Sequence, residues 1–537
     1  MDRRTSLKVI GAAGTAAAFP SQILAQGSRA SSSLDPYASM HWGHGFEGQR
    51  RADLGNGTFL NPVFAGDHPD PSLIRDGDDY YVTFSSFDAY PGVVIWHSRD
   101  LVNWRPVTAA LKRPIGSVWA PGLAKCQGRF YCYIPAHYPD SRSIYVIHAD
   151  RIEGPWSDPV DLHLPKHIDP SHVVDEQGRR WLFLSGGDRV QLSPDGLSTI
   201  GVPQHVYDPW HYPEDWVVEG FSPEGPKVVR RGDFYYIVTA VGGTAGPPTS
   251  HMVIVARSRS LAGPWENDPE NPVVHTSSAL EKWWSRGHAT LFEGPGDRWW
   301  MIYHGYENGY WTLGRQTLLE PIKWTADGWP RALGGDLSKP LRKPFDLGPQ
   351  PHGFPLSDDF STNKFGIEWG FYAPAPNEME RIRRANGAMF VRGKGASPSD
   401  CSPISCIVGD QRYKVECDIE AGPENEAGLL LFYNHRLYAG LGFSSTESVM
   451  HRYGEQRRGA LLPGMGGRIR MRITNDRNIL TIHTSADGGA SWRKYEPQME
   501  VSGYHHNVAG DFLSLRPALY SAKSGEARFS NFTYMAL

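Results

Sequence analysis

The chain of 537 residues is too long for one ordinary domain, so it predicts two. Its formal net charge is −4 and it has no long basic block, which argues against nucleic acid as a partner. Aromatic residues are frequent (18 Trp, 24 Tyr and 22 Phe), and 58 Gly and 42 Pro separate many short apolar runs. This composition predicts an all-β fold and suits a neutral ligand such as a sugar.

The first residues resemble an export signal. In "MDRRTSLKVIGAAGTAAAFPSQILAQ", Arg3 and Arg4 precede a short apolar stretch rich in Gly and Ala. This is typical of a twin-arginine signal peptide, although a serine stands where a phenylalanine is usual. The stretch is too short and too weakly apolar for a membrane-spanning helix, so no membrane anchor is predicted. We expect residues 1–25 to direct export to the periplasm or the medium, and the polar residues 26–56 to form a linker.

A strand pattern recurs five times along the first two thirds of the chain. The copies are "GDDYYVTF", "GRFYCYIP", "GRRWLFLS", "GDFYYIVT" and "GDRWWMIYH", which begin at Gly77, Gly128, Gly178, Gly232 and Gly296. Each copy reads as a turn glycine, a charged residue and then the aromatic and β-branched residues of a strand that follows a hairpin. The copies are roughly 50–65 residues apart, close to the length of a propeller blade. We predict a five-bladed β-propeller over residues 57–345, with four antiparallel strands in each blade.

The pattern changes after a passage rich in Pro and Gly, "KPLRKPFDLGPQPHGFPLSDDF". From there on, strands with alternating apolar and polar residues follow one another, such as "YKVECDIE", "GLLLFYN", "GRIRMRIT" and "ILTIHTS". Alternation of this kind is expected where one face of each strand is buried. We predict a β-sandwich domain over residues 356–537.

Three acidic residues stand at matching places ahead of three of the repeats. Asp70 lies between two prolines before the first repeat, and Asp169 is followed by proline and serine before the third. Glu224 stands beside glycine and proline before the fourth. A surface turn is the ordinary explanation of one aspartate beside proline, but solvated acids would not be expected to keep one register on three blades. We therefore predict that these carboxylates meet where the inner strands converge.

Two carboxyl groups that face each other across a channel suit glycoside hydrolysis with inversion. One carboxylate deprotonates water and one carboxylic acid protonates the leaving oxygen, with about 6.5–9.5 Å between them. The acid has to stay protonated near neutral pH, and a nearby anion helps because it disfavours a second negative charge.

Seven motifs, taken in order, resemble those of glycoside hydrolase family 43, the five-bladed arabinofuranosidases and β-xylosidases. They are "HPDPSLIRDGDDYY", "SSFDAYPGV", "VWAPGL", "IDPSHVVDEQGR", "EGPKVVRRGDFYY", "RGHATL" and "LGRQTLLEP". The resemblance covers essentially the whole chain after the signal, including a C-terminal concanavalin-like sandwich. It implies that Asp70 is the general base, Glu224 the general acid, and Asp169 the third carboxylate, which orients the acid and tunes its pKa.

The assignment of the acid has one alternative. Glu219 stands five residues before Glu224 in "VVEGFSPEGP", and each begins a Glu-Gly pair. The distance from Glu224 to "GDFYY" and the proline that follows it match the family pattern, which favours Glu224.

The same resemblance implies four residues that bind the substrate. Phe87 and Trp119 are implied as stacking platforms for a sugar ring, and the less favoured alternative for Trp119 is a tryptophan of a blade core. Arg315 resembles the substrate-binding arginine, and His288 resembles a channel histidine that hydrogen-bonds near the site or contacts calcium in relatives. The ordinary alternative for His288 is a satisfied core histidine. No metal ligand is assigned and no cofactor is required. Calcium in the propeller channel stays an open option, although the sequence has no EF-hand loop.

The resemblance implies an exo-acting, inverting glycoside hydrolase. It would release terminal α-L-arabinofuranosyl or β-D-xylosyl units from plant cell-wall saccharides, and the segments "VGGTAGPPTSHMVIVARS" and "ENGYWTLGRQ" are expected to shape the choice of sugar. The exo action is implied because the sandwich helps to close the pocket in similar proteins. Three alternatives stay open: a carbohydrate-binding propeller without catalysis, another exo specificity such as galactan, and a sandwich that binds polysaccharide by itself. A retaining fructosidase is disfavoured because its nucleophile and Glu-Cys motifs are absent.

Overall fold

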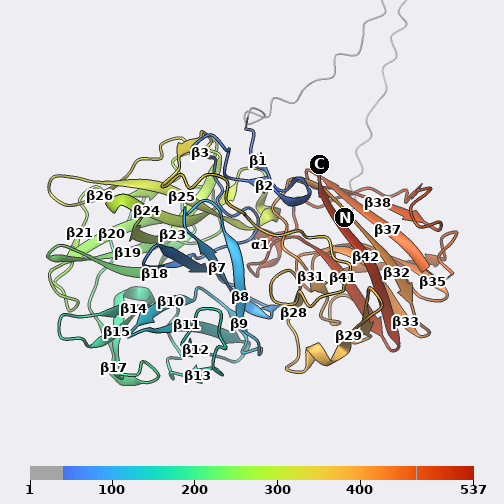
Figure 1. Ribbon diagram of the computed structural model, residues 1–537, viewed down its shortest axis with the longest axis horizontal. Helices are drawn as coiled ribbons and strands as arrows, with labels where there is room; N and C mark the ends of the chain where they lie inside the picture. Colours follow the sequence, from blue (N-terminus) through green and yellow to red (C-terminus); the bar gives the residue numbers. More distant parts are fainter. Residues whose placement is uncertain (1–39, 467) are drawn as a thin grey trace, which may run out of the picture. The chain divides into compact units, whose positions relative to one another are not determined.

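The computed structural model describes residues 40–537 except Gly467, and these residues form a five-bladed propeller and a sandwich (Figure 1). The predicted all-β fold class is therefore confirmed. The predicted signal peptide, residues 1–25, lies outside the described residues. Within the described residues, no helix is long and apolar enough to cross a membrane.

Each blade of the propeller is one antiparallel sheet whose strands follow one another in chain order. The first blade consists of β4 (Ser72–Asp76), β5 (Asp79–Thr83), β7 (Gly92–Ser98) and β8 (Arg105–Leu111). The second consists of β10 (Gly122–Cys126), β11 (Arg129–Tyr138), β12 (Ser141–Ala149) and β13 (Val160–Asp161), with the short β9 (Ser117–Val118) paired to β11. The third consists of β14 (Ser171–Val174), β15 (Arg180–Leu184), β16 (Asp188–Leu192) and β17 (Thr199–His205).

The last two blades follow the same order. The fourth consists of β18 (Gly220–Arg231), β19 (Phe234–Gly242), β20 (Met252–Ser258) and β21 (Glu266–Asn267), with β22 (Val274–His275) paired to β20. The fifth consists of β23 (Trp283–Glu293), β24 (Trp299–Glu307), β25 (Arg315–Trp324) and β26 (Pro330–Ala332). Four single-turn 3-10 helices lie in loops of the described chain after the first blade: η2 (Ser185–Gly187), η3 (Pro295–Asp297), η4 (Trp311–Leu313) and η5 (Glu378–Arg381).

The repeat glycines mark the hairpin between the first and second strand of each blade. All five have a positive φ, between 59° and 78°, which glycine adopts without a steric penalty: Gly77, Gly128, Gly178, Gly232 and Gly296. The first strands β4, β10, β14, β18 and β23 each contact the first strand of the next blade, and β23 contacts β4. The first strands therefore form the closed inner ring of the propeller, and their ends converge as predicted.

The sandwich is made of two large antiparallel sheets. One contains β36 (Glu455–Ala460), β35 (Glu447–Arg452), β34 (Tyr438–Phe443), β33 (Asn425–Phe432), β41 (Arg516–Lys523), β31 (Ile404–Ser405) and β28 (Gly370–Tyr372). The other contains β29 (Ile382–Ala385), β30 (Ala388–Arg392), β42 (Glu526–Ala536), β32 (Arg412–Ala421), β37 (Arg468–Asp476), β38 (Ile479–Ser485) and β39 (Arg493–Lys494), with β40 (Met499–Glu500) paired to β38. The alternation in the sequence has the expected effect, because Ile469, Met471 and Ile473 of β37 are fully buried.

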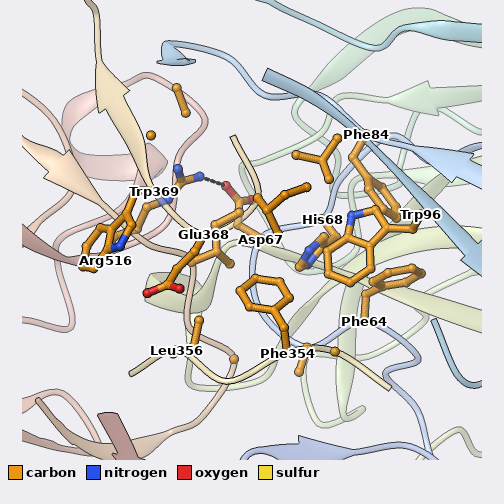
Figure 2. Close-up of a pocket in the computed structure, with 18 of the residues that line it drawn as sticks. Phe64, Asp67, His68, Phe84, Trp96, Phe354, Leu356, Glu368, Trp369 and Arg516 are labelled. Atoms are coloured by element: carbon orange, nitrogen blue, oxygen red, sulfur yellow. Dashed lines mark hydrogen bonds and ion pairs between the residues drawn. The ribbon is translucent and has the colours of Figure 1, made fainter. Parts of the chain in front are cut away.

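The propeller and the sandwich share structure. The short strand β6 (Ala89–Tyr90) of the first blade pairs with β28 and so extends a sandwich sheet. Nearby, Arg516 of β41 donates to the carboxylate of Asp67 over 2.8 Å, and both side chains are buried. Figure 2 shows this pair at the edge of a cavity of about 140 Å³ between the first blade and the sandwich, with Phe64, Trp96 and other rings around it. None of the three predicted catalytic acids lines this cavity.

The expected polar linker is wrong for its last part. Residues 40–56 contain β1 (Gly43–His44), η1 (Phe46–Gly48) and β2 (Arg50–Arg51), and the chain continues into β3 (Thr58–Phe59), which pairs with β27 (Leu341–Arg342). Arg50 donates to Glu307 over 2.9 Å in the propeller and to the backbone oxygen of Gly409 over 2.7 Å on the sandwich side. Arg50 therefore bridges the two domains and is not a solvated linker residue.

Candidate active site

The three predicted acids lie at the same end of the inner ring. Asp70 and Asp169 come just before β4 and β14, and Glu224 lies inside β18. Asp70 and Asp169 are 4% and 2% exposed, and the Glu224 side chain is 19% exposed. The backbones of Asp70 and Asp169 have φ of +58° and +55°, a left-handed conformation that is uncommon for residues other than glycine and is found at functional sites.

Asp70 is held as an anion by its neighbours. Arg315 Nη1 lies 2.8 Å from its Oδ1, and the Ser85 hydroxyl donates to Oδ2 over 2.5 Å. The Asp70 backbone N–H donates to Nδ1 of His304 over 3.1 Å. Burial alone would raise the pKa of Asp70, but the charge of Arg315 and the nearby His288 and His304 outweigh it and bring the pKa well below its usual value. A permanently ionised, fixed carboxylate is what a general base requires.

Glu224 has the opposite protonation behaviour. Burial, followed by the negative charge of Asp70, raises the pKa of Glu224 to about 8. His251 Nε2 and His288 Nδ1 lie 3.6 Å and 3.7 Å from its Oε1, and burial lowers the pKa of both histidines, so they stay neutral and do not favour ionisation. Glu224 is therefore a protonated acid at neutral pH, able to give a proton to a leaving oxygen.

Asp169 contacts the backbone of the residue that follows Glu224. Its Oδ2 accepts a hydrogen bond from the Gly225 N–H over 2.9 Å, which fixes the chain next to Glu224. Burial raises the pKa of Asp169 to about 7; His288 opposes this rise and Glu224 adds to it. The pKa of Glu224 itself is raised mainly by burial and by Asp70. The hydrogen bond to Gly225 gives Asp169 an orienting contact, and its charge also interacts with that of Glu224.

His288 stands between the base and the acid. Its Nδ1 is 3.4 Å from Asp70 Oδ1 and 3.7 Å from Glu224 Oε1, so these two oxygens are no further apart than the sum of both distances. That upper limit falls in the lower part of the range of about 6.5–9.5 Å that inverting glycosidases use to admit a water molecule. An ionised carboxylate and a neutral carboxylic acid on either side of a glycosidic bond can activate water on one side and protonate the leaving oxygen on the other.

Of the predicted substrate-binding residues, His288 and Arg315 contact the catalytic pair, and Phe87 and Trp119 form an aromatic group with Phe512 of the sandwich. Phe87 is 3% exposed, and its ring stacks on Phe512 of the sandwich with 5.5 Å between the ring centres. The Arg315 guanidinium lies 5.4 Å and 5.2 Å from the centres of these two rings. Trp119 is half-buried, stacks on His137 and meets Phe512 edge-on at 5.5 Å. Trp119 is thus the more open platform, while Phe87 is packed under Phe512.

Several residues of the site were not predicted from the sequence. His304 and Ser85 contact Asp70, His251 contacts Glu224, and Phe512 closes the aromatic wall. His304 carried a weak signal, since it is a polar residue inside the apolar repeat strand "GDRWWMIYH". Phe512 carried none, because it lies in another domain, just after α1 (His506–Ala509).

One group of side chains in the channel can be compared with the ligands that calcium takes. Among the described residues, one group could hold a cation: Glu224, His251 and His288, whose donor atoms all lie within 4.8 Å of one another. Calcium takes six to eight oxygen ligands, whereas this group offers two imidazoles and one carboxylate. These three side chains do not by themselves make up a calcium site, and no step of the chemistry is assigned to a metal.

The protonation states predict the pH dependence of hydrolysis. Because Glu224 must be protonated, kcat/KM should fall as the pH rises through about 8, while Asp70 stays ionised and active down to low pH. A profile from about pH 5 to about pH 9 with a 4-nitrophenyl glycoside measures this limb. A dinitrophenyl glycoside, which needs little proton donation, is the control and should keep its activity above pH 8. An upper limb near the ordinary pKa of glutamate would contradict the assignment.

Comparison with known proteins finds family matches over both the propeller and the sandwich. A family model described as glycosyl hydrolases family 43 matches residues 59–330, and one described as the beta xylosidase C-terminal concanavalin A-like domain matches residues 357–535. A non-reducing end alpha-L-arabinofuranosidase of Bacteroides ovatus is 33% identical over 63% of this chain and 66% of its own length, just under two thirds. A xylan 1,3-beta-xylosidase of a Vibrio species is 33% identical over 70% of this chain and 77% of its own.

A solved structure gives the same result for the fold. The crystal structure of a xylan beta-1,4-xylosidase from Bacillus halodurans matches with a TM-score of 0.79 and 26% identity. The match covers 89% of this chain and 99% of that one, so it includes both the propeller and the sandwich.

Proposed function

The chain belongs to glycosyl hydrolase family 43, and from this premise we propose that it is an exo-acting, inverting glycosidase. Asp70 is the general base, Glu224 the general acid, and Asp169 positions the acid through Gly225. The observation that carries the proposal is the contrast between two carboxyl groups at one site, one buried and one partly buried. One has a pKa held well below its usual value and the other a pKa raised to about 8.

The proposed reaction follows from this arrangement. A water molecule beside Asp70 loses its proton to the carboxylate and attacks the anomeric carbon from one face. The bond to the leaving oxygen breaks on the other face, and Glu224 gives its proton to that oxygen. Asp70 ends protonated and Glu224 ionised, and exchange with solvent restores both. The sugar that leaves has the opposite anomeric configuration.

Exo action is supported by the wall that the sandwich adds. Phe512 stacks on Phe87 and meets Trp119, so aromatic rings from two domains enclose one side of the site. A pocket closed in this way accepts the end of a saccharide more readily than its middle. We propose terminal α-L-arabinofuranosyl and β-D-xylosyl units of plant cell-wall saccharides as the sugars released, because the curated relatives carry the names of both activities. Export, periplasmic or extracellular, is proposed from residues 1–25 alone.

One experiment tests the sugar and the stereochemistry together. The protein is incubated with 4-nitrophenyl α-L-arabinofuranoside and with the matching β-D-xyloside, and proton NMR follows the anomer that first appears. We expect hydrolysis of at least one substrate, with β-arabinose or α-xylose as the first product. Retention of configuration would overturn the acid/base assignment. Binding of the oligosaccharides without hydrolysis of any glycoside would favour the carbohydrate-binding alternative.

A further inference from the structure

The loop from Gly242 to Ser250, which joins β19 to β20, is folded around the side chain of Glu219. The backbone N–H of Ala245 donates to Glu219 Oε2 over 3.0 Å. A Cβ atom on Gly243 would lie 2.5 Å from that same oxygen, and one on Gly246 would lie 2.9 Å from Glu219 Cβ. Both glycines have a positive φ. The loop therefore needs glycine at these places in order to close on the carboxylate.

The residue beside this hydrogen bond reaches the catalytic base. Thr244 precedes Ala245, and its hydroxyl oxygen accepts a hydrogen bond from Arg315 Nη1 over 2.9 Å. The same oxygen lies 3.4 Å from Nε2 of His304. Arg315 and His304 are two of the groups that contact Asp70. A continuous series of contacts thus joins the Glu219 carboxylate to the base through one loop.

We propose that Glu219 is a positioning residue of the active site: it holds the glycine loop so that Thr244 fixes Arg315, and with it Asp70. This inference rests on the proposed function, in which Asp70 is the base. It also gives a role to the acid that the sequence offered as an alternative to Glu224. Glu219 is an exposed residue whose carboxylate accepts from the Ala245 N–H of the loop.

The side chain can be removed without releasing the ends of the loop. The Glu219 backbone N–H donates to the Ser250 hydroxyl over 2.9 Å and to the Gly242 carbonyl over 3.1 Å. Asn507 of the sandwich accepts from the Gly246 N–H over 3.1 Å. These contacts stay in Glu219→Ala, so the change should affect the position of Thr244 more than the stability of the blade.

The test compares Glu219→Ala, Glu219→Gln, Thr244→Val and the double variant Glu219→Ala/Thr244→Val on the better 4-nitrophenyl glycoside. We expect Glu219→Ala to lower kcat roughly tenfold with KM little changed, since a small misplacement of a catalytic group costs rate and not substrate binding. Glu219→Gln should keep activity within about threefold, because its amide oxygen still accepts from Ala245. Glu214→Ala, an exposed carboxylate in the segment before β18, is the matched control and should behave as wild type.

The double variant decides whether the two residues act along one route. If they do, the kcat of the double variant should equal that of the slower single variant. Its fold-loss should not be the product of the two single fold-losses. A multiplicative loss, wild-type kcat in Glu219→Ala, or a Glu219→Gln variant as slow as Glu219→Ala would each overturn the inference. Should Glu219→Ala fail to fold, as judged by its melting temperature, a Thr244→Val variant with wild-type kcat would overturn it as well. Failure of the proposed function is distinct, because the wild type would then be inactive.

Discussion

Asp70→Asn is expected to lower kcat by about 10²–10⁴-fold on every glycoside, whatever its leaving group. The amide cannot take a proton from water, and water must attack however good the leaving group is. Glu224→Gln should lower kcat by about 10²-fold or more on an alkyl or sugar aglycone, but far less on a dinitrophenyl glycoside. That leaving group departs as a stable anion and does not need the proton.

The dependence of rate on the leaving group distinguishes the base variant Asp70→Asn from the acid variant Glu224→Gln in one set of assays. Rates are measured for both variants and wild type on a series of glycosides whose leaving-group pKa increases. Glu219→Gln is the control for the acid role, because Glu219 stands five residues before Glu224 in the sequence. Its rates should follow those of the wild type along the series. If Glu219→Gln instead showed the steep dependence on leaving group, the acid would be Glu219 and the assignment of Glu224 would be wrong.

The propeller was predictable because its signal is local and repeated. Each hairpin needs a positive φ at one residue, so Gly77 and its four counterparts stand at the same place in every blade. The sharing of structure between the domains was not predictable. Strand β6 is two residues long and joins a sheet through β28, about 280 positions later, so no local pattern announces it. Arg50 likewise binds residues hundreds of positions away, and in the sequence it reads as part of a polar linker.

The site was predictable where the residues sit in a recognisable local context. Asp70, Asp169 and Glu224 stand beside proline or glycine at the start of inner strands, and the structure brings them together with His288 and Arg315. Residues that reach the site from elsewhere could not be found in this way. Phe512 comes from a loop of the second domain, and only the folded structure places its ring against Phe87. Protonation states could not be predicted from the sequence either, because they depend on burial and neighbouring charges, which a sequence motif does not give.

Arg315→Met is expected to move the acidic limb of the kcat/KM profile to higher pH and to lower kcat/KM about 10²-fold at about pH 5. The guanidinium lies 2.8 Å from Asp70 and both side chains are almost fully buried, so its charge outweighs much of the cost of burying the carboxylate. Without it, burial raises the pKa of Asp70. The base is then protonated at pH values where the wild type is fully active, and activity should recover in part as the pH rises.

Arg516→Met separates this effect from simple loss of a buried ion pair. Arg516 pairs with Asp67 over the same 2.8 Å and is also buried, but it does not touch Asp70. Both variants should have a lower melting temperature, since each leaves a buried carboxylate without its partner. Only Arg315→Met should move the acidic limb. Equal limbs in wild type and Arg315→Met would show that the pKa of Asp70 is held down by its hydrogen bonds, and the loss of rate would then reflect substrate binding alone.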